Sequence, residues 1–500
     1  MLWSPVQAVT NATMDVTGMR SNGGYADKMV HAALAAEASI QLYRCALLMM
    51  AGRHVAGLSA AHASYRSFLG IPESTESQYA KDTRTFGLGF FAVLLSYLPP
   101  FYRVSFNSVA ISLGISREDG IAMLKTCALQ TEKGTVFSVM ASLCLSLMDI
   151  MTSSQQGAFD SQIRERCLKR AKERLTTMTT SKRNVLVQWT LAQIIKRCGD
   201  YNEAKDVCVE IMTTIGPYLE GKTFSLDRTP DYELATNFHA NLGTNKSFVY
   251  RVRMDLASTL MMTNNWEAAI AVLEPLTSND TKYVARGLAL MYRAGVLAQL
   301  DPNDPKIQVA YDSIQQLSII DSNKKQMEGQ MDYVLHRKAL QDSRRKDRRL
   351  ALFDMLYVWG HFGLASNSCL EQVVGKLNET YEAIHQRFSE NENNLDFREE
   401  YVALLMLRGS IWQYMLEDED AERDLLLCVE LTRDQLFSDP YHLPHALVEL
   451  GTLYFRQGKR IEAKTVLLEA QHLPEGYIFD RALQMRVEGP LYMMMEEGKE

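Results

Sequence analysis

The stretch from Leu447 to Ala470 restricts the fold of this chain more than any other, because it carries two amphipathic helical patterns joined by a short polar break. Both patterns place small, apolar and aromatic side chains three or four residues apart, before and after Gly458. The positions concerned are Leu447, Leu450, Gly451, Tyr454, Ala463, Leu467 and Ala470. Small residues let two antiparallel helices approach closely, and the larger ones fill the space between them. One such pair cannot bury both of its faces, so the stretch predicts further helices stacked beside it.

Three earlier stretches repeat this arrangement. They are residues 184–211, 252–276 and 401–428. The order of small, apolar and aromatic positions is that of a tetratricopeptide repeat. The equivalent alanines of the last two copies, Ala421 and Ala463, are 42 residues apart rather than the 34 of a contiguous array. We therefore expect other helices and loops to interrupt the repeats.

An all-α fold follows from these patterns, because no run of the chain shows the period-two alternation of a strand. We predict an α-solenoid of tetratricopeptide-repeat type that follows a non-repeat helical N-terminal region. The expected divisions are a loose N-terminal tail at 1–24, the N-terminal helical region at 25–160, interrupted helical repeats at 161–345 and C-terminal helical repeats at 346–500. Residues 1–24 carry no apolar core typical of a secretory signal.

Composition excludes several classes of protein. A hydrophobic content of 47% is too high for a mainly disordered chain, and a net charge of −7 does not favour nucleic acid as a partner. The eight cysteines lie apart, at positions 45, 127, 144, 167, 198, 208, 369 and 428. Scattered thiols without CxxC pairs favour a reducing compartment, so we expect a cytoplasmic protein.

Two apolar runs resemble membrane spans, Phe86–Leu98 and Thr135–Met148. Each is shorter than the roughly 20 residues that a spanning helix needs, so we interpret both as buried core helices. Gly87 and Gly89 fall inside the first run, where a tight helix crossing is a better interpretation than a phosphate-binding loop.

The sequence contains no recognisable catalytic motif, and we expect no enzyme activity, no cofactor and no metal site. His442 and His445 lie three residues apart at a predicted helix start, but no cysteine or carboxylate cluster accompanies them. An acidic turn at 417–420, continued by Glu422 and Asp424, lacks the spacing of a calcium loop. We interpret it as a solvated turn that could also attract basic segments.

Two basic segments stand out. The first holds Arg164, Arg166, Lys169, Arg170, Lys172 and Arg174 within one predicted helix. The second holds Arg337, Lys338, Arg344, Arg345, Lys346, Arg348 and Arg349. A run of charge on a helical protein is usually a solvated face. The more specific hypothesis makes the second segment a docking site for an acidic peptide, a phosphate or lipid headgroups.

Three blocks of the sequence resemble the tetratricopeptide repeat protein 39 family, which includes the fungal inclusion body clearance proteins. The blocks are Phe86–Pro100 with Leu113–Ile121, then Val334–Leu340 with Leu356–Gly360, and finally the last repeat with Tyr477–Leu491. Ser116 stands where the family usually has glycine, and the segment from Arg486 to Gly489 differs from the family's ending. These departures indicate a distant member.

The resemblance implies a non-enzymatic helical-repeat adaptor linked to inclusion body clearance, protein quality control, lipid homeostasis or cilium assembly. Our main hypothesis is a protein-interaction scaffold, because the four repeats predict a groove for a peptide or helix. The alternative is a peripheral protein of a lipid or membrane surface, such as an organelle or lipid droplet. It rests on the apolar N-terminal helices and the second basic segment.

Overall fold

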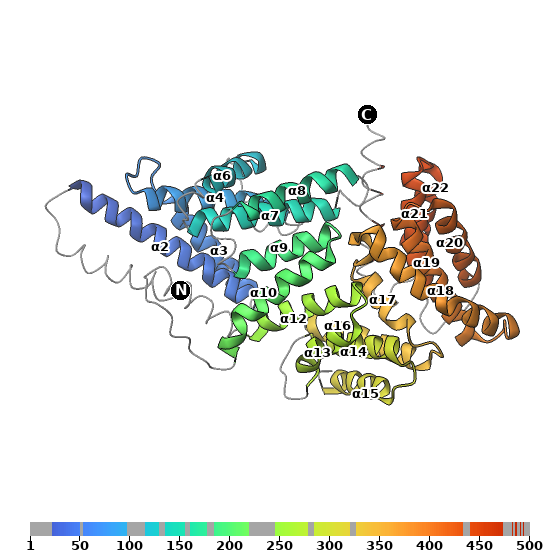
Figure 1. Cartoon of the computed structure of the whole chain (residues 1–500). Coiled ribbons are helices and arrows are strands. Elements are labelled where there is room, and N and C mark those ends of the chain that lie inside the picture. The colour runs from blue at the N-terminus through green and yellow to red at the C-terminus, as the bar shows by residue number, and fades with distance from the viewer. Residues whose placement is uncertain are drawn as a thin grey trace. The chain divides into compact units, whose positions relative to one another are not determined.

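The computed structural model describes most of the chain in separate stretches. They are residues 23–50, 54–97, 116–129, 136–155, 161–177, 185–219, 246–278, 285–320, 327–433 and 441–473, together with residues 483, 486, 487, 491 and 494. Every regular element in these stretches is a helix (Figure 1), which confirms the predicted all-α class. The predicted tail lies almost entirely outside the described residues. None of the described helices is both long and apolar enough to cross a bilayer.

The chain forms two compact units, and each is described by itself. The first holds α2 (Gly23–Met50), α3 (His54–Leu69), α4 (Gln78–Tyr97), α6 (Arg117–Leu129) and α7 (Val136–Gln155). The division between the units falls inside α7, after Met151, and again inside α8 (Ser161–Thr176) and α9 (Val185–Arg197). This division does not follow the predicted ranges, because all of the described residues between 191 and 500 belong to the second unit.

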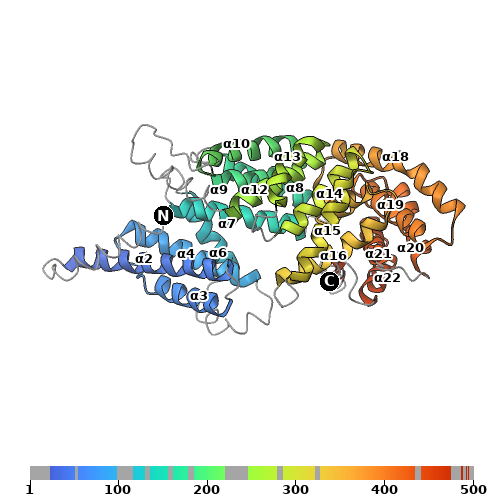
Figure 2. The ribbon, with the colours of Figure 1, turned by 90° about the horizontal axis from the view of Figure 1, so that it is seen from below.

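In the first unit, α2 packs alongside α3 and α4 (Figure 2). Small side chains allow this approach, since Ala38 is fully buried and its carbonyl accepts a hydrogen bond of 2.7 Å from the Ser64 hydroxyl. A methyl group at Gly87 would lie 2.5 Å from the Phe68 ring, and one at Gly89 would lie 2.9 Å from the Gly120 carbonyl. The two glycines therefore serve helix crossings, as predicted, and the first part of the apolar run, from Phe86 to Val93, is mostly buried in α4, whereas Leu94 is exposed.

The second unit contains the remaining helices. They are α10 (Tyr201–Leu219), α12 (Lys246–Met262), α13 (Trp266–Thr277), α14 (Arg286–Leu300), α15 (Pro305–Ile320), α16 (Met327–Arg344), α17 (Leu350–Val358), the 3-10 helix η3 (Phe362–Leu364), α18 (Asn367–Glu390), α19 (Leu395–Tyr414), α20 (Asp418–Arg433), α21 (His442–Arg456) and α22 (Arg460–His472). Most of them pack against the next helix along the chain. In addition, α14 contacts α17, α17 contacts α19, and α19 contacts α21.

Four helix pairs occupy the four predicted repeat stretches and turn in the same way. The pairs are α9–α10, α12–α13, α19–α20 and α21–α22. One residue in each turn has a left-handed backbone: Gly199, Asn264, Leu416 and Gly458, with φ of 86°, 55°, 67° and 76°. The next N–H donates to the carbonyl five residues earlier, for example from Asp200 to Ile195 and from Lys459 to Tyr454. This pattern is a Schellman motif, which satisfies carbonyl groups at the helix end.

Inside these pairs the small residues make room for large ones. A methyl group at Gly409 would lie 2.7 Å from Leu425, and one at Gly451 would lie 2.5 Å from Leu467. The alanine near the start of each second helix is almost completely buried: Ala204, Ala269, Ala421 and Ala463. Of the seven residues in the last repeat, Tyr454 alone is only half-buried, and its hydroxyl donates to Glu422 at 3.1 Å. The small residues thus allow the two helices of a pair to approach closely.

Candidate functional site

The second basic segment is not the exposed docking surface that the sequence suggested. Lys338 is fully buried and Arg345 is 7% exposed. The Lys338 ammonium donates to both Asp342 and Asp354, the latter at 2.9 Å, and the Arg345 guanidinium donates to Asp354 at 2.6 Å. Neither cation can reach an external anion, so the docking hypothesis is wrong for these two residues, and so is the simpler idea of a solvated face.

Lys338 and Arg345 are buried because they pair with a carboxylate, Asp354, that lies outside the basic segment in the sequence. Asp354 lies on α17, whose side chains from Leu350 to Tyr357 are all buried, so the packing of this apolar helix carries the acid inward. Burial alone would raise the pKa of Asp354, but the charges of Arg345 and Lys338 hold it well below its usual range. The Tyr441 hydroxyl donates a further hydrogen bond of 2.8 Å to Asp354. We call Lys338, Asp342, Arg345, Asp354 and Tyr441 the buried charge network.

Other residues of the second basic segment form contacts that connect neighbouring helices. Arg349 forms a bidentate pair with Asp347, at 2.6 and 2.8 Å, and the Asp347 N–H donates to Glu400 on α19. Arg348 reaches Gln308 of α15 at 3.4 Å. Arg344 and Lys346 are exposed, whereas Arg337 is half-buried. The segment between α16 and α17 is therefore mainly a structural junction.

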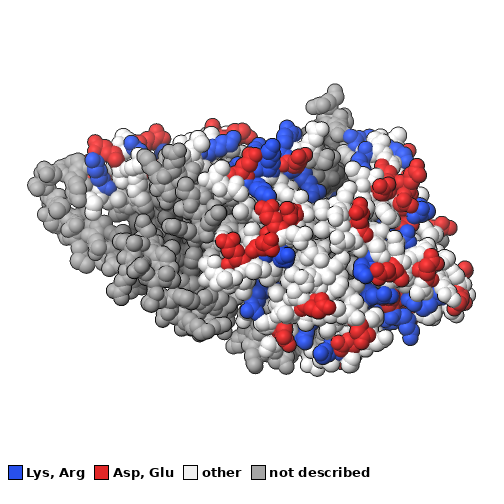
Figure 3. Space-filling model, in the orientation of Figure 1, with Lys and Arg blue, Asp and Glu red and all other residues white. Residues whose placement is uncertain are grey.

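The first basic segment is also largely engaged. Arg164 donates to the carbonyls of Gly363 and Arg197, at 2.6 and 3.2 Å. Within the first unit, Arg170 and Arg174 pair with Asp149 at 2.7 and 3.0 Å. Arg166 and Lys169 are exposed, and Lys172 is half-buried. On the face drawn in Figure 3, acidic and basic side chains of the described residues are interspersed.

The acidic turn pairs with basic groups of the next helix pair. Asp418 pairs with Arg456 on α21, and Glu422 lies 3.8 Å from the Lys459 ammonium. These contacts join the α19–α20 pair to the next one. Exposed pairs of this kind contribute little stability, so we assign them a role in register.

A second polar cluster was missed by the sequence reasoning. Glu449 of α21 has no side-chain exposure, and it accepts hydrogen bonds from Tyr357 of α17 at 2.7 Å and from Tyr414 of α19 at 3.2 Å. Arg486 pairs with Glu449 and donates to the Tyr357 oxygen at 2.9 Å. Burial opposes the charge of Arg486, but Glu449 and the two phenols raise its pKa well above the usual value. A glutamate inside an apolar helical face was the signal available in the sequence.

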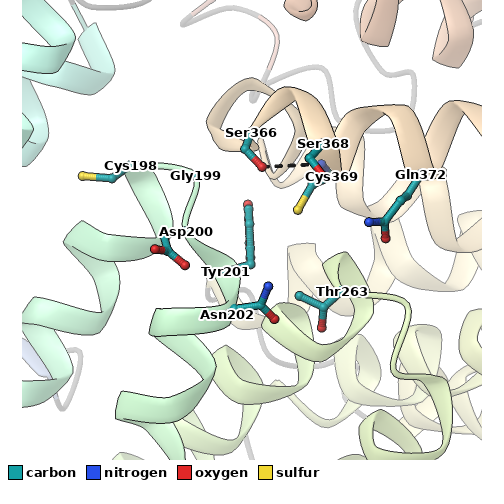
Figure 4. A pocket seen from close by; sticks show the side chains of 10 residues that line it. All are labelled: Cys198, Gly199, Asp200, Tyr201, Asn202, Thr263, Ser366, Ser368, Cys369 and Gln372. Atoms are coloured by element: carbon teal, nitrogen blue, oxygen red, sulfur yellow. Dashed lines mark hydrogen bonds between the residues drawn. The ribbon is translucent and has the colours of Figure 1, made fainter.

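A polar cavity of about 420 Å³ lies among the turns of the first two helix pairs and the start of α18 (Figure 4). It is lined by Cys198, Gly199, Asp200, Tyr201, Asn202, Thr263, Ser366, Ser368, Cys369 and Gln372. A methyl group at Gly199 would lie 2.9 Å from the Ser366 nitrogen, so only glycine fits there. The lining offers hydroxyls and amides, with Asp200 as its single charged side chain. Such groups suit hydrogen bonds with a polar ligand, for example a peptide backbone.

The two histidines of α21 face the core. Each is 1% exposed, and burial lowers the pKa of His445 to about 3 and that of His442 well below its usual value. Among the described residues, no group of histidine, cysteine and carboxylate side chains has the arrangement of a metal site. Burial also raises the pKa of the Cys127, Cys144 and Cys208 thiols to about 12, which makes them poor nucleophiles.

Comparison of the sequence with protein-family models and with curated proteins gives no match.

Proposed function

We propose that this chain is a non-enzymatic helical-repeat scaffold, a solenoid of tetratricopeptide-repeat type that binds a protein partner. The observation that carries the proposal is the common construction of four helix pairs, each with a left-handed turn residue and a buried alanine twelve positions after a small residue. Repeats of this kind are binding surfaces rather than catalytic centres. The charged groups that look most reactive in the sequence hold helices together instead.

The contacts between α14, α17, α19 and α21 support a continuous inner face. Each of these helices touches the next in the series, although other helices separate them in the sequence. Such a row is the arrangement in which repeat proteins present a concave groove to an extended peptide or helix. The polar cavity beside α18 adds hydrogen-bonding groups at another place in the same unit.

Purification of the full chain from native lysate, followed by rebinding of the recovered partner in pure form, tests this proposal. We expect saturable binding by a specific partner. A chain that elutes alone, and that enriches nothing above control in proximity labelling, contradicts the proposal. Gln372→Arg places a charge at the cavity, and Gln386→Arg, at an exposed position fourteen residues further along the same helix and outside the cavity lining, is its matched control. A loss of affinity confined to Gln372→Arg would locate the contact at the cavity.

The resemblance to the tetratricopeptide repeat protein 39 family is a further ground for the proposal. It directs the search for a partner to protein quality control, lipid homeostasis and cilium assembly, and to the cytoplasm or the surface of an organelle or lipid droplet.

The second candidate is binding at a lipid or membrane surface, which the exposed Arg344 and Lys346 still favour. Flotation of the full chain with vesicles of phosphatidylcholine and phosphatidylserine at low salt separates the candidates. Flotation that is lost in Arg344→Gln/Lys346→Gln supports the lipid surface. If the wild-type chain stays at the bottom of the gradient, this candidate is excluded.

A further inference from the structure

We infer that α17, α19 and α21 form a binding site for an amphipathic helix that carries an arginine, and that the C-terminal segment occupies this site as an internal ligand. By the C-terminal segment we mean Leu483, Arg486, Val487, Leu491 and Met494, all of them helical. The inference rests on the proposed scaffold function, because it names the class of partner that the inner face would take.

The core of the site is built for a guanidinium group. We call Tyr357, Tyr414 and Glu449 the arginine site, since each contributes an oxygen to Arg486. One nitrogen of Arg486 reaches the Tyr357 oxygen at 2.9 Å, while another reaches Tyr414 at 3.2 Å and Glu449. The guanidinium carbon also lies 5.4 Å from the centre of the Tyr357 ring. A planar cation with several donors fits these groups, whereas an ammonium is a single point charge.

The site requires a cation. Glu449 is completely buried, and a buried carboxylate without a counter-charge is strongly unfavourable. His445, whose ring nitrogen lies 3.3 Å from the Tyr357 hydroxyl, does not supply this charge, because burial lowers its pKa to about 3. Arg486 therefore supplies the counter-charge that Glu449 needs, and an arginine from another chain could supply it equally well.

Apolar residues flank the arginine on one helical face. Leu483, Val487, Leu491 and Met494 are four, four and three residues apart, and all four pack against the core of the second unit. Leu483 and Val487 are almost completely buried, while Leu491 and Met494 are half-buried. Anchors at this spacing are typical of an amphipathic helix in a groove.

The segment joins the core differently from the helices before it. The last two helix pairs interlock through a glycine and a leucine, as at Gly451 and Leu467. The described residues of the segment attach instead through the Arg486 guanidinium and four apolar side chains. The Arg486 side chain keeps 33% of its exposure although its guanidinium is engaged. A partner helix with the same arrangement would replace these contacts one for one. It would compete against an internal ligand at millimolar effective concentration.

A labelled peptide tests the inference in the full-length chain. The probe is a fluorescent peptide that copies residues 477–497, and the control peptide carries glutamate in place of the arginine. We expect the Arg486→Glu chain to bind the probe at least tenfold more tightly than the wild-type chain, because its own segment no longer fills the site. Arg486→Lys should fall between the two. Equal binding by the wild-type and Arg486→Glu chains, or equal binding of both peptides, overturns the inference.

Hydrogen exchange of the wild-type chain gives a second test that needs no variant. An internal ligand leaves its site without global unfolding, so amides at 483–494 should exchange at least tenfold faster than those of α19 and α21. Exchange at the same rate would make the segment an integral part of the fold and overturn the inference. Capture of a partner by the wild-type chain would still support the scaffold proposal, so the two failures can be told apart.

Discussion

The replacement of Lys338 by methionine tests how far the buried charge network stabilises the second unit. Methionine keeps the length of the side chain but removes the ammonium that lies 2.9 Å from Asp354 and also pairs with Asp342. The two carboxylates would then share Arg345, which lies 2.6 Å from one and 3.2 Å from the other. Removal of one partner from a buried ion pair costs about 3–5 kcal/mol. We expect a loss of this size for Lys338→Met.

The matched control is Lys346→Met, which removes an equal charge from an exposed position eight residues away. A surface change of this kind should alter the free energy of unfolding by less than about 0.5 kcal/mol. The double variant Lys338→Met/Asp342→Leu removes one charge of each sign and leaves Arg345 paired with Asp354. It should therefore be less destabilised than Lys338→Met alone.

Hydrogen exchange followed by mass spectrometry is the suitable assay, because it follows the helices around the network separately from those of the first unit. Peptides from α17 and α21 should exchange about a hundredfold to a thousandfold faster in Lys338→Met than in Lys346→Met, since every 1.4 kcal/mol is a factor of ten. Equal exchange in the two variants would refute the reasoning, because it would mean that the network does not contribute to stability.

Four further predictions concern packing, acid sensitivity and thiol chemistry. Gly451→Ala should lower the free energy of unfolding by about 1–3 kcal/mol, because the added methyl group forces Leu467 aside. Gly375 in α18 has open space around it, so Gly375→Ala should raise the free energy of unfolding by about 0.5–1 kcal/mol. Thermal melting of the two variants checks this order. Ala463→Trp should overpack the last helix pair and lower the free energy of unfolding by about 1–3 kcal/mol or more. An unchanged melting temperature would mean that the register of this helix pair is misassigned. Because burial lowers the pKa of His445 to about 3, the folded chain binds fewer protons than the unfolded chain below about pH 6.5. Stability should fall by up to about 1.4 kcal/mol per pH unit between 6.5 and 3, and the slope of unfolding free energy against pH should be smaller in His445→Gln. Among the described thiols, exposed Cys198 should be alkylated first and buried Cys428 last, as peptide mapping would reveal.

Much of the fold could be predicted from the sequence, because helical periodicity is a local property. The apolar faces of α4 and of the last helix pair were recognised from spacing alone, and both lie in the core. The left-handed turn that the four helix pairs share could be predicted only in part from the sequence. Glycine marks it at Gly199 and Gly458, and asparagine, which tolerates the left-handed region, marks it at Asn264, but Leu416 adopts the same backbone without a signal. Leu416 is itself exposed, and a leucine does not favour this conformation, so the short turn between the packed helices α19 and α20 imposes it.

The candidate site was harder to predict, because its pairs join distant parts of the chain. Arg345 meets Tyr441, and Arg486 meets Tyr357 more than a hundred residues away. A count of charges within a short window cannot find such partners, so the basic segment looked exposed. The useful signals were acids at apolar positions, Asp354 and Glu449, since a buried carboxylate implies a cation nearby.

The buried charge network also bears on how the second unit unfolds. Helices that touch chiefly their neighbours in sequence behave as a one-dimensional array, which can open from either end in small steps. The Arg345–Tyr441 contact and the shared carboxylate of Asp354 link α16 and α17 to the start of α21, across the whole of α18, α19 and α20. Opening any helix of this interval disturbs charges that have no access to water. We therefore expect the stretch from α16 to α21 to unfold as one cooperative block, while α12 and α13 open more independently.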